Sequence, residues 1–488
     1  MSLLEEAGFN FYNSYRKLPS FFYSNVDNAD PIRPQLRILN EDLAKVLELD
    51  IQYLKKQEII SILSGNYKET SLTPIAQAYA GHQFGNFTML GDGRAMLLGE
   101  HVTHNNERYD IQLKGSGKTT FSRGGDGKAT LGSMLREYII SEAIHALHIP
   151  TTRSLAVVTT GEEVRREVEM EGAVLTRIAS SHIRVGTFQY ARSFGGIQEL
   201  QVLADYTIER HYPTLLKEPD RYLQLLKQVV KKQAQTIAKW QLVGFIHGVM
   251  NTDNMTISGE TIDYGPCAFM DEYNPKTVFS SIDHTGRYAY GNQPNMGGWN
   301  VARFAETLLP LIDENEEQAL ELAQKAISEF PDHFHEEWLG GMRKKLGLQT
   351  EEDEDATLIR ELLELMHEYQ ADYTNTFVAL TMDDRTSMVL FQIEAFQQWY
   401  KKWQERMTRQ QLRVDAVKEM MKQHNPAIIP RNHHVEDAIT AAVSHHDDKP
   451  LRDLLAVITK PFAHTTDQKE YASLPPKALR PQHTYCGT

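Results

Sequence analysis

The chain has 488 residues, of which 41% are hydrophobic and 24% are charged, as is ordinary for a globular protein. Its 65 acidic and 51 basic residues give a net charge of −14, which argues against nucleic acid as a partner, because phosphate binding needs a dense basic surface. No apolar run approaches the roughly 18 residues of a membrane span, and the acidic start resembles neither a signal peptide nor a transit peptide. We therefore expect a cytoplasmic monomer that binds neither nucleic acid nor a membrane.

The first 184 residues divide into two parts by pattern. Residues 1–75 look irregular and are punctuated by prolines, so we expect an N-terminal extension there. Residues 76–184 alternate short β-like runs with turns around one helical pattern at 131–147 that Pro150 closes. The expected strands are 95–98, 109–114, 154–159 and 173–178. These patterns predict a small lobe built on a sheet.

From residue 185 onward the pattern is helical. Apolar residues at helical spacing predict one long helix over 220–244, and further helices at 300–311, 316–330, 356–369, 388–407 and 413–422. We expect a helical lobe over 185–455 and an extended C-terminal tail over 456–488. The predicted fold class is α+β, with a β-rich N-lobe and a helical C-lobe as in protein kinases, although many α+β proteins share that layout.

The strongest chemical signal is the segment 247–254, His-Gly-Val-Met-Asn-Thr-Asp-Asn, followed by Asp-Tyr-Gly at 263–265. Protein kinases place H-x-D-x-x-x-x-N in a catalytic loop after a long helix, with D-F-G shortly downstream. Because Mg²⁺ takes one or two carboxylate or amide ligands besides phosphates, Asn254 and Asp263 are candidates for its ligands. Val249 holds the position of the kinase base and cannot accept a proton. Either the chain is an inactive kinase, or another group such as Asp253 takes that role.

A second signal is Lys114, which ends the expected strand 109–114. Strand alternation places it on the same face as Gln112 and opposite Ile111 and Leu113. In kinases such a lysine neutralises phosphates and is held by a carboxylate on the following helix, which here is Glu137.

Two glycine-containing segments and two arginines complete the candidates for nucleotide binding. Glycines at 90–94 and at 123–128 allow close approach of the backbone to a nucleotide, although each segment can also be an ordinary turn or connection. Arg177 and Arg184 follow the first lobe, and arginine forks suit phosphate, although surface salt bridges are their commoner use.

Nine segments of the chain, taken together, resemble motifs of the selenoprotein O family of protein adenylyltransferases. The resemblance runs from about Leu18 to the C-terminus, and its motifs are more specific than a generic kinase pattern. The segments are 80–85, 90–94, 112–117, 149–153, 247–254, 263–266, 286–290, 292–294 and 299–300.

Members of that family resemble kinases in fold but bind ATP in a flipped orientation, and they transfer AMP to Ser, Thr or Tyr hydroxyls of proteins. The resemblance implies ATP and Mg²⁺ as cofactors, with Mn²⁺ as a substitute, and proteins as partners. It implies that Asn254 and Asp263 bind the metal, that Asp253 accepts the proton and that Glu137 orients Lys114. The residues implied to contact the nucleotide are Gly91, Gly93, Arg94, Lys114, Asp126, Gly127, Arg177, Arg184 and Asp263.

Two other functions stay open on the sequence. One is phosphoryl transfer by a protein or small-molecule kinase, against which Val249 counts. The other is an inactive pseudokinase that binds ATP only to hold its fold. The joint presence of Lys114, Glu137, Asn254 and Asp263 counts against that scaffold, which needs no complete pair of metal ligands.

The chain has two cysteines, too few for a disulfide scaffold. Cys267 follows the segment 263–266 directly, and Cys486 is third from the end, on a tail that can reach back. Some eukaryotic members of the family carry selenocysteine near that end. We hypothesise a reversible disulfide between the two cysteines that modulates activity.

Overall fold

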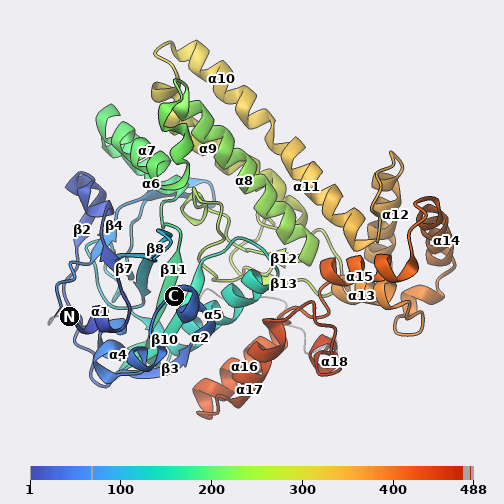
Figure 1. Cartoon of the computed structure of the whole chain (residues 1–488), viewed down its shortest axis with the longest axis horizontal. Coiled ribbons are helices and arrows are strands. Elements are labelled where there is room, and N and C mark those ends of the chain that lie inside the picture. Colours follow the sequence, from blue (N-terminus) through green and yellow to red (C-terminus); the bar gives the residue numbers. More distant parts are fainter. Residues whose placement is uncertain (1, 68–69, 476–483, 485–488) are drawn as a thin grey trace.

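The computed structural model describes residues 2–67, 70–475 and 484 (Figure 1). An antiparallel sheet from the N-terminal part is followed by a largely helical C-terminal part, which confirms the α+β class. Within the described residues the main sheet joins nine strands in the order β2-β4-β7-β8-β11-β10-β3, with β1 on β7 and β9 on β11. Its strands are β1 Phe11–Tyr12, β2 Tyr23–Asn25, β3 Gln35–Leu39, β4 Ile75–Gln77, β7 Ala95–Val102, β8 Arg108–Lys114, β9 Ala129–Thr130, β10 Arg153–Arg165 and β11 Glu169–Ala179.

The four strands expected from the sequence lie within β7, β8, β10 and β11. The prediction of irregular structure over residues 1–75 is wrong, because this stretch adds short strands to both edges of the sheet and carries four helices. Strands of two to five residues are too short to show alternation, and their hydrogen bonds come from distant parts of the chain. The helices are α1 Leu3–Glu6, α2 Glu41–Val46, α3 Ile51–Leu54 and α4 Gln57–Leu63.

Helices cover the two faces of the sheet. Met96 and Leu98 of β7 join a core with residues of α2, α3 and α4, whereas Leu97 between them joins the core that contains α5 (Leu131–Ala146). This alternation confirms the predicted faces of β8, because Ile111 and Leu113 belong to the first core. Gln112 and Lys114 therefore point toward the side of α5.

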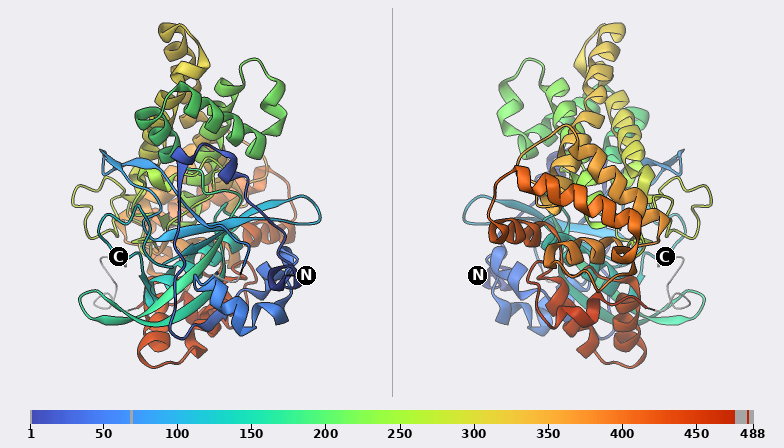
Figure 2. Two further views of the ribbon diagram at one scale, coloured as in Figure 1. Left: turned by 90° about the vertical axis from the view of Figure 1, so that its left-hand side faces the viewer. Right: turned by 90° about the vertical axis from the view of Figure 1, so that its right-hand side faces the viewer.

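The helical part is built around α8 (Arg221–Val243), which packs against α9, α10 and α11. Figure 2 shows α12–α15 on the side of the molecule opposite the N-terminal helices. The remaining helices are α6 Val185–Phe194, α7 Ile197–His211, α9 Gln293–Ile312, α10 Glu316–Ser328, α11 Phe330–Lys345, α12 Asp355–Glu368, α13 Tyr373–Met382, α14 Glu394–Arg409, α15 Val414–His424, α16 Asn432–Ser444, α17 Lys449–Ile458 and α18 Gln468–Ala472. No helix in the described part of the chain is long and apolar enough to cross a membrane.

The expected helices agree with α8, α9, α10, α12, α14 and α15 in place, with shifted ends. Sequence patterns missed α6, α7, α11, α13, α16 and α17, and α18 lies in the tail that was expected to be extended. Several of these helices take their stability from tertiary contacts. Helix α16, for example, packs on α5, and Arg136 of α5 donates to the side chain of Asn432 and pairs with Glu436.

A buried lysine at the end of α11 gives a test of this packing. Lys345 is 2% exposed, and its ammonium lies over the rings of Phe377 and Tyr373, 4.2 and 5.5 Å from their centroids. Burial lowers the pKa of Lys345 to about 7. The unfolded chain therefore binds one more proton than the folded protein between pH 7 and 10.5, and stability rises with pH across that window.

We expect Lys345→Met to raise the free energy of unfolding by roughly 2–4 kcal/mol at pH 7, because methionine removes the cost of deprotonating the lysine amine or burying its charge. The gain should shrink as the pH approaches 10. Urea denaturation of both proteins across this range measures it. The control is Lys344→Met, which changes the exposed neighbour and should leave the pH dependence of stability unchanged. An equal gain in stability from Lys345→Met at all pH values would show that the pKa of Lys345 is not lowered.

Candidate active site

A cavity of about 610 Å³ is lined by strands of the sheet, by α5 and by the loop around Asp253. It brings together every predicted site residue other than the cysteines, although they come from segments far apart in the sequence. These residues are Gly91, Gly93, Arg94, Lys114, Asp126, Gly127, Glu137, Arg177, Arg184, Asp253, Asn254 and Asp263.

Three cations converge on the carboxylate of Asp263 in this cavity. Its Oδ1 accepts hydrogen bonds from Nζ of Lys114 (2.6 Å) and Nη1 of Arg177 (2.6 Å), and its Oδ2 accepts one from Nη1 of Arg184 (2.8 Å). Burial pushes the pKa of Asp263 upward, but the three positive charges outweigh burial and hold that pKa well below its usual range. The arginines are thus part of a buried cluster and not of surface salt bridges.

The other partners of the cations fix their positions. Lys114 pairs with Oε2 of Glu137 on α5 at 2.6 Å. Gln112 accepts a hydrogen bond from Nε of Arg177 (3.1 Å) and donates one to Asp92 (3.1 Å). Because all these side chains are buried, each must be paired, so the cluster has few alternative arrangements.

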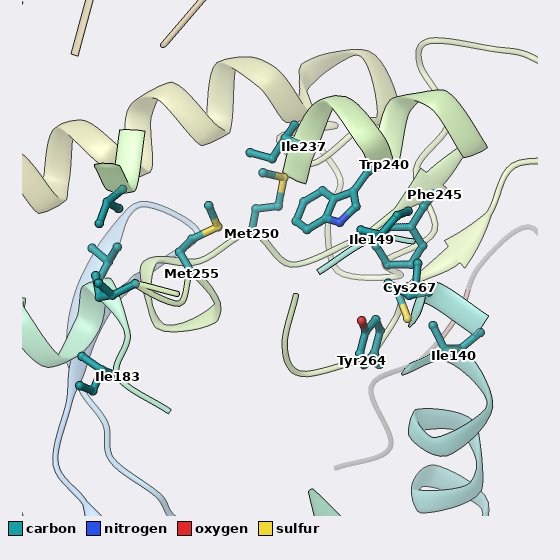
Figure 3. Packing of buried hydrophobic residues seen from close by; sticks show 14 of the residues in the cluster. Ile140, Ile149, Ile183, Ile237, Trp240, Phe245, Met250, Met255, Tyr264 and Cys267 are labelled. Carbon is teal, nitrogen blue, oxygen red and sulfur yellow. The ribbon is translucent and has the colours of Figure 1, made fainter. Parts of the chain in front are cut away.

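Local structure places the two motifs side by side. The strands β12 (Phe245–Ile246) and β13 (Ala268–Phe269) pair with each other and bring segments 247–254 and 263–266 together. His247 makes a hydrogen bond through Nε2 to the carbonyl of Ile262 (2.9 Å). Below the motifs, Met250, Met255, Tyr264 and Cys267 belong to the large hydrophobic core, so apolar packing holds both segments (Figure 3).

Asp263 itself has a left-handed backbone with φ of +63°. This conformation costs a non-glycine residue about 1 kcal/mol or more. The cation cluster and the packed Tyr264 beside it hold Asp263 there against the strain. Such strain is typical of functional positions.

Asp253 is buried in the same cavity, and its Oδ1 has no hydrogen-bond partner. Burial raises the pKa of this carboxyl to about 6, and Arg184 offsets the rise only in part. The hairpin of β5 (Ala80–Gln83) and β6 (Asn86–Met89) lies against it so closely that a Cβ at Gly81 would come within 2.5 Å of Oδ1. A buried acceptor atom that lacks a partner is suited to accept a hydrogen bond from a substrate.

The oxygen donors of the cavity fit a magnesium ion. Asn254 donates from Nδ2 to the carbonyl of Val249 (2.9 Å), which fixes the amide and leaves Oδ1 as an acceptor beside the carboxylates of Asp253 and Asp263. The described residues contain no group of three or more His, Cys, Asp or Glu that could hold a metal by themselves. Mg²⁺ commonly takes most of its ligands from phosphates and water.

Sequence reasoning missed several residues that line the cavity or order its cluster. The guanidinium of Arg184 lies 4.5 Å from the ring centre of Tyr79, a residue that no sequence motif marks. Asp92 and Gln83 also line the cavity. They lie in the motif segments 90–94 and 80–85, and this position could have marked them as site residues. Arg166 holds the predicted Asp126 by two hydrogen bonds of 2.8 and 3.2 Å.

The predicted disulfide joins Cys267 to Cys486. Cys267 is buried in the core behind Asp263, and Cys486 lies outside the described residues. The disulfide stays a prediction.

Comparison with known proteins finds relatives over nearly the whole chain. The profile of a family described as "Protein adenylyltransferase SelO" matches residues 6–459. The chain is 60% identical to the protein nucleotidyltransferase YdiU of Brevibacillus brevis over 484 residues, 99% of this chain and 98% of that protein. It is 58% identical to proteins of the same description from Geobacillus kaustophilus (99% and 100% covered) and Clostridium botulinum (99% and 98% covered).

Because the hairpin lies so close to Asp253, adding a single methyl group at Gly81 should lower the activity of the protein. Gly81→Ala should displace Asp253 and lower ATP turnover more than about tenfold, because small misplacements of reacting groups are costly. Gly340→Ala on α11 is the control, since its Cβ meets nothing within 4 Å; it should keep full turnover and stabilise the helix by ~1 kcal/mol. Equal turnover of the two variants would show that the hairpin does not position Asp253.

Proposed function

The chain belongs to the SelO family of protein adenylyltransferases, and from this membership we propose that it transfers AMP from ATP to Ser, Thr or Tyr hydroxyls of other proteins and releases pyrophosphate. The observation that carries the proposal is the convergence of Lys114, Arg177 and Arg184 on Asp263, in the cavity that also contains Asp253. The cavity therefore contains both a binding site for a polyphosphate and a candidate general base.

The cations support a flipped orientation of ATP. Lys114, Arg177 and Arg184 each carry several N–H donors and line the cavity around Asp263, so they can hold phosphate oxygens as well as this carboxylate. With the β- and γ-phosphates buried against them, the α-phosphorus would face the mouth of the cavity and the acceptor. The same charges would stabilise the pyrophosphate, where negative charge grows in the transition state.

Asp253 is the candidate proton acceptor. Val249 lines the cavity at the position of the kinase base and has no group that takes a proton. Asp253 lies in the same loop, with Oδ1 free of internal hydrogen bonds. A substrate hydroxyl that donates to this oxygen would be polarised toward attack on the α-phosphorus.

Asn254 and Asp263 would hold Mg²⁺, which supplies further positive charge to the phosphates when bound. The pairing of Lys114 with Glu137, and the order of long helix, loop and Asp-Tyr-Gly segment, support a kinase-like fold in two lobes. The nucleotide would then lie between the sheet and the helical part.

Two substitutions test the cation cluster. Lys114→Met and Asp263→Asn should each reduce AMP transfer by about a hundredfold or more, because each removes charge that positions the phosphates. The exposed counterparts Lys325→Met and Asp332→Asn are the controls. Near-normal transfer by either cluster variant, at saturating ATP and Mg²⁺, would mean that the cluster only stabilises the fold.

The position of the label decides the reaction type. Label from the α-phosphate of ATP should become bound to protein, self-modification included, and label from the γ-phosphate should not. Asp253→Asn should lower the rate about a hundredfold with little change in ATP affinity, whereas Arg184→Gln should weaken ATP binding as well. Transfer of γ-label would identify a kinase with a different base, and transfer of neither label to any protein would favour an inactive scaffold.

A further inference from the structure

A second hollow, of about 560 Å³, opens on the surface next to the catalytic loop. We call it the Arg287 groove; its lining residues are Phe84, Ile282, Asp283, His284, Thr285, Arg287, Asn292 and Met296. Ile282 is 62% exposed and gives the groove an apolar wall. None of these residues lines the nucleotide cavity, so the groove is a separate site.

One asparagine joins the groove to the cavity. The side-chain oxygen of Asn251, which lines the cavity, accepts hydrogen bonds from the backbone N–H of Phe84 (3.0 Å) and the hydroxyl of Tyr288 (2.7 Å). Asn251 precedes Asp253 by two residues. A chain that occupies the groove therefore lies next to the loop that carries Asp253.

The guanidinium of Arg287 is held in the groove by aromatic rings and has no acidic partner among the described residues. It lies 4.8 Å from the ring centre of Trp299 and 5.7 Å from that of Tyr288. It also lies against the hairpin turn, where a Cβ at Gly85 would be 3.7 Å from it. Its Nε is buried and makes no hydrogen bond, and no ion pair in the described part of the chain includes it. Arg303, 5.1 Å from the same Trp299 ring, is by contrast paired with Glu306.

Besides Arg287, the described lining of the groove contains one acidic side chain, and that side chain is turned to the backbone. Asp283 is the acidic residue of the lining, but it is buried and its two carboxylate oxygens accept the backbone N–H groups of Arg287 (2.9 Å) and Tyr288 (2.8 Å). Its two oxygens are thus engaged by the backbone. Arg287 is left as the cation that this groove, beside the loop that carries Asp253, offers to a ligand.

We propose that the Arg287 groove binds the segment of the acceptor protein next to the modified hydroxyl, and that Arg287 selects an Asp or Glu side chain in that segment. The inference rests on the proposed function, and it adds a substrate class: hydroxyls in acidic surroundings. An arginine held by aromatic rings is oriented in advance, so it loses little entropy on pairing with a carboxylate. Ile282 provides apolar contact for the neighbouring residues of the same segment.

Binding of synthetic peptides tests the groove without any reaction. The probes are fluorescein-labelled peptides with a central serine, flanked by glutamate, glutamine or lysine. The wild-type protein should bind the glutamate peptide about tenfold more tightly than the glutamine peptide. Arg287→Gln should remove this preference, Arg287→Lys should keep part of it, and Arg287→Glu should transfer it to the lysine peptide. Arg360→Gln, on the exposed side of α12, should behave as the wild type.

A transfer experiment with the same variants separates the groove from the nucleotide site. A random peptide library with fixed Ser, Thr or Tyr is incubated with α-labelled ATP, and the modified peptides are sequenced. Wild-type products should be enriched in Asp and Glu near the acceptor, and Arg287→Gln should lose the enrichment with its KM for ATP unchanged. Thermal unfolding shows that each variant is folded.

The outcomes for the two proposals are distinct. AMP transfer without a preference for acidic peptides, or a preference that survives in Arg287→Gln, would contradict the proposed role of the groove. Either result would leave the proposed AMP transfer unaffected. Weaker ATP binding by Arg287→Gln would place this residue in the nucleotide site and would also contradict the proposal that the groove binds the acceptor. Arg287-dependent binding of the glutamate peptide without any AMP transfer would support the groove and contradict the proposed function.

Discussion

The shared carboxylate of Asp263 is the interaction on which the site depends. Lys114, Arg177 and Arg184 carry three positive charges into a buried place, and such charges are tolerated only when they are paired. Asp263 pairs with all three at once, and Glu137 pairs with two of them. The sheet, α5 and the segment after β12 are therefore held in one arrangement by charge as well as by packing.

That arrangement also explains why a strained backbone is retained. Asp263 must reach cations from β8, from β11 and from the start of α6, and the left-handed conformation at this residue allows it. The apolar residues on both sides of the two motifs belong to one continuous core, so the strain is supported by a large packed volume. Bound phosphates would share the same cations, which links nucleotide binding to the stability of the whole cluster.

Close packing of the β5–β6 hairpin sets a second constraint. A Cβ at Gly186 would come within 2.0 Å of the carbonyl of Ala80, and one at Gly81 would contact Asp253, so the hairpin lies directly on the helical part. Gln189 connects the same hairpin to the loop 247–254, because it makes hydrogen bonds to His82 (2.8 Å) and Thr252 (2.7 Å). The hairpin thus forms one wall of the cavity, and its turn faces Arg287 in the neighbouring groove.

The long helices and strands and the chemistry of the motifs can be predicted from the amino-acid sequence alone. Helix α8, strand β8 and the spacing from His247 to Asp263 are readable because periodicity and loop motifs are local properties of the chain. Three features became visible only in the folded protein: Arg177 and Arg184 are buried partners of Asp263, strands β1, β2 and β3 join the sheet, and Arg287 is held against Trp299. These features come from contacts between residues far apart in the chain. Short edge strands and single arginines have no period, so the fold alone determines their partners.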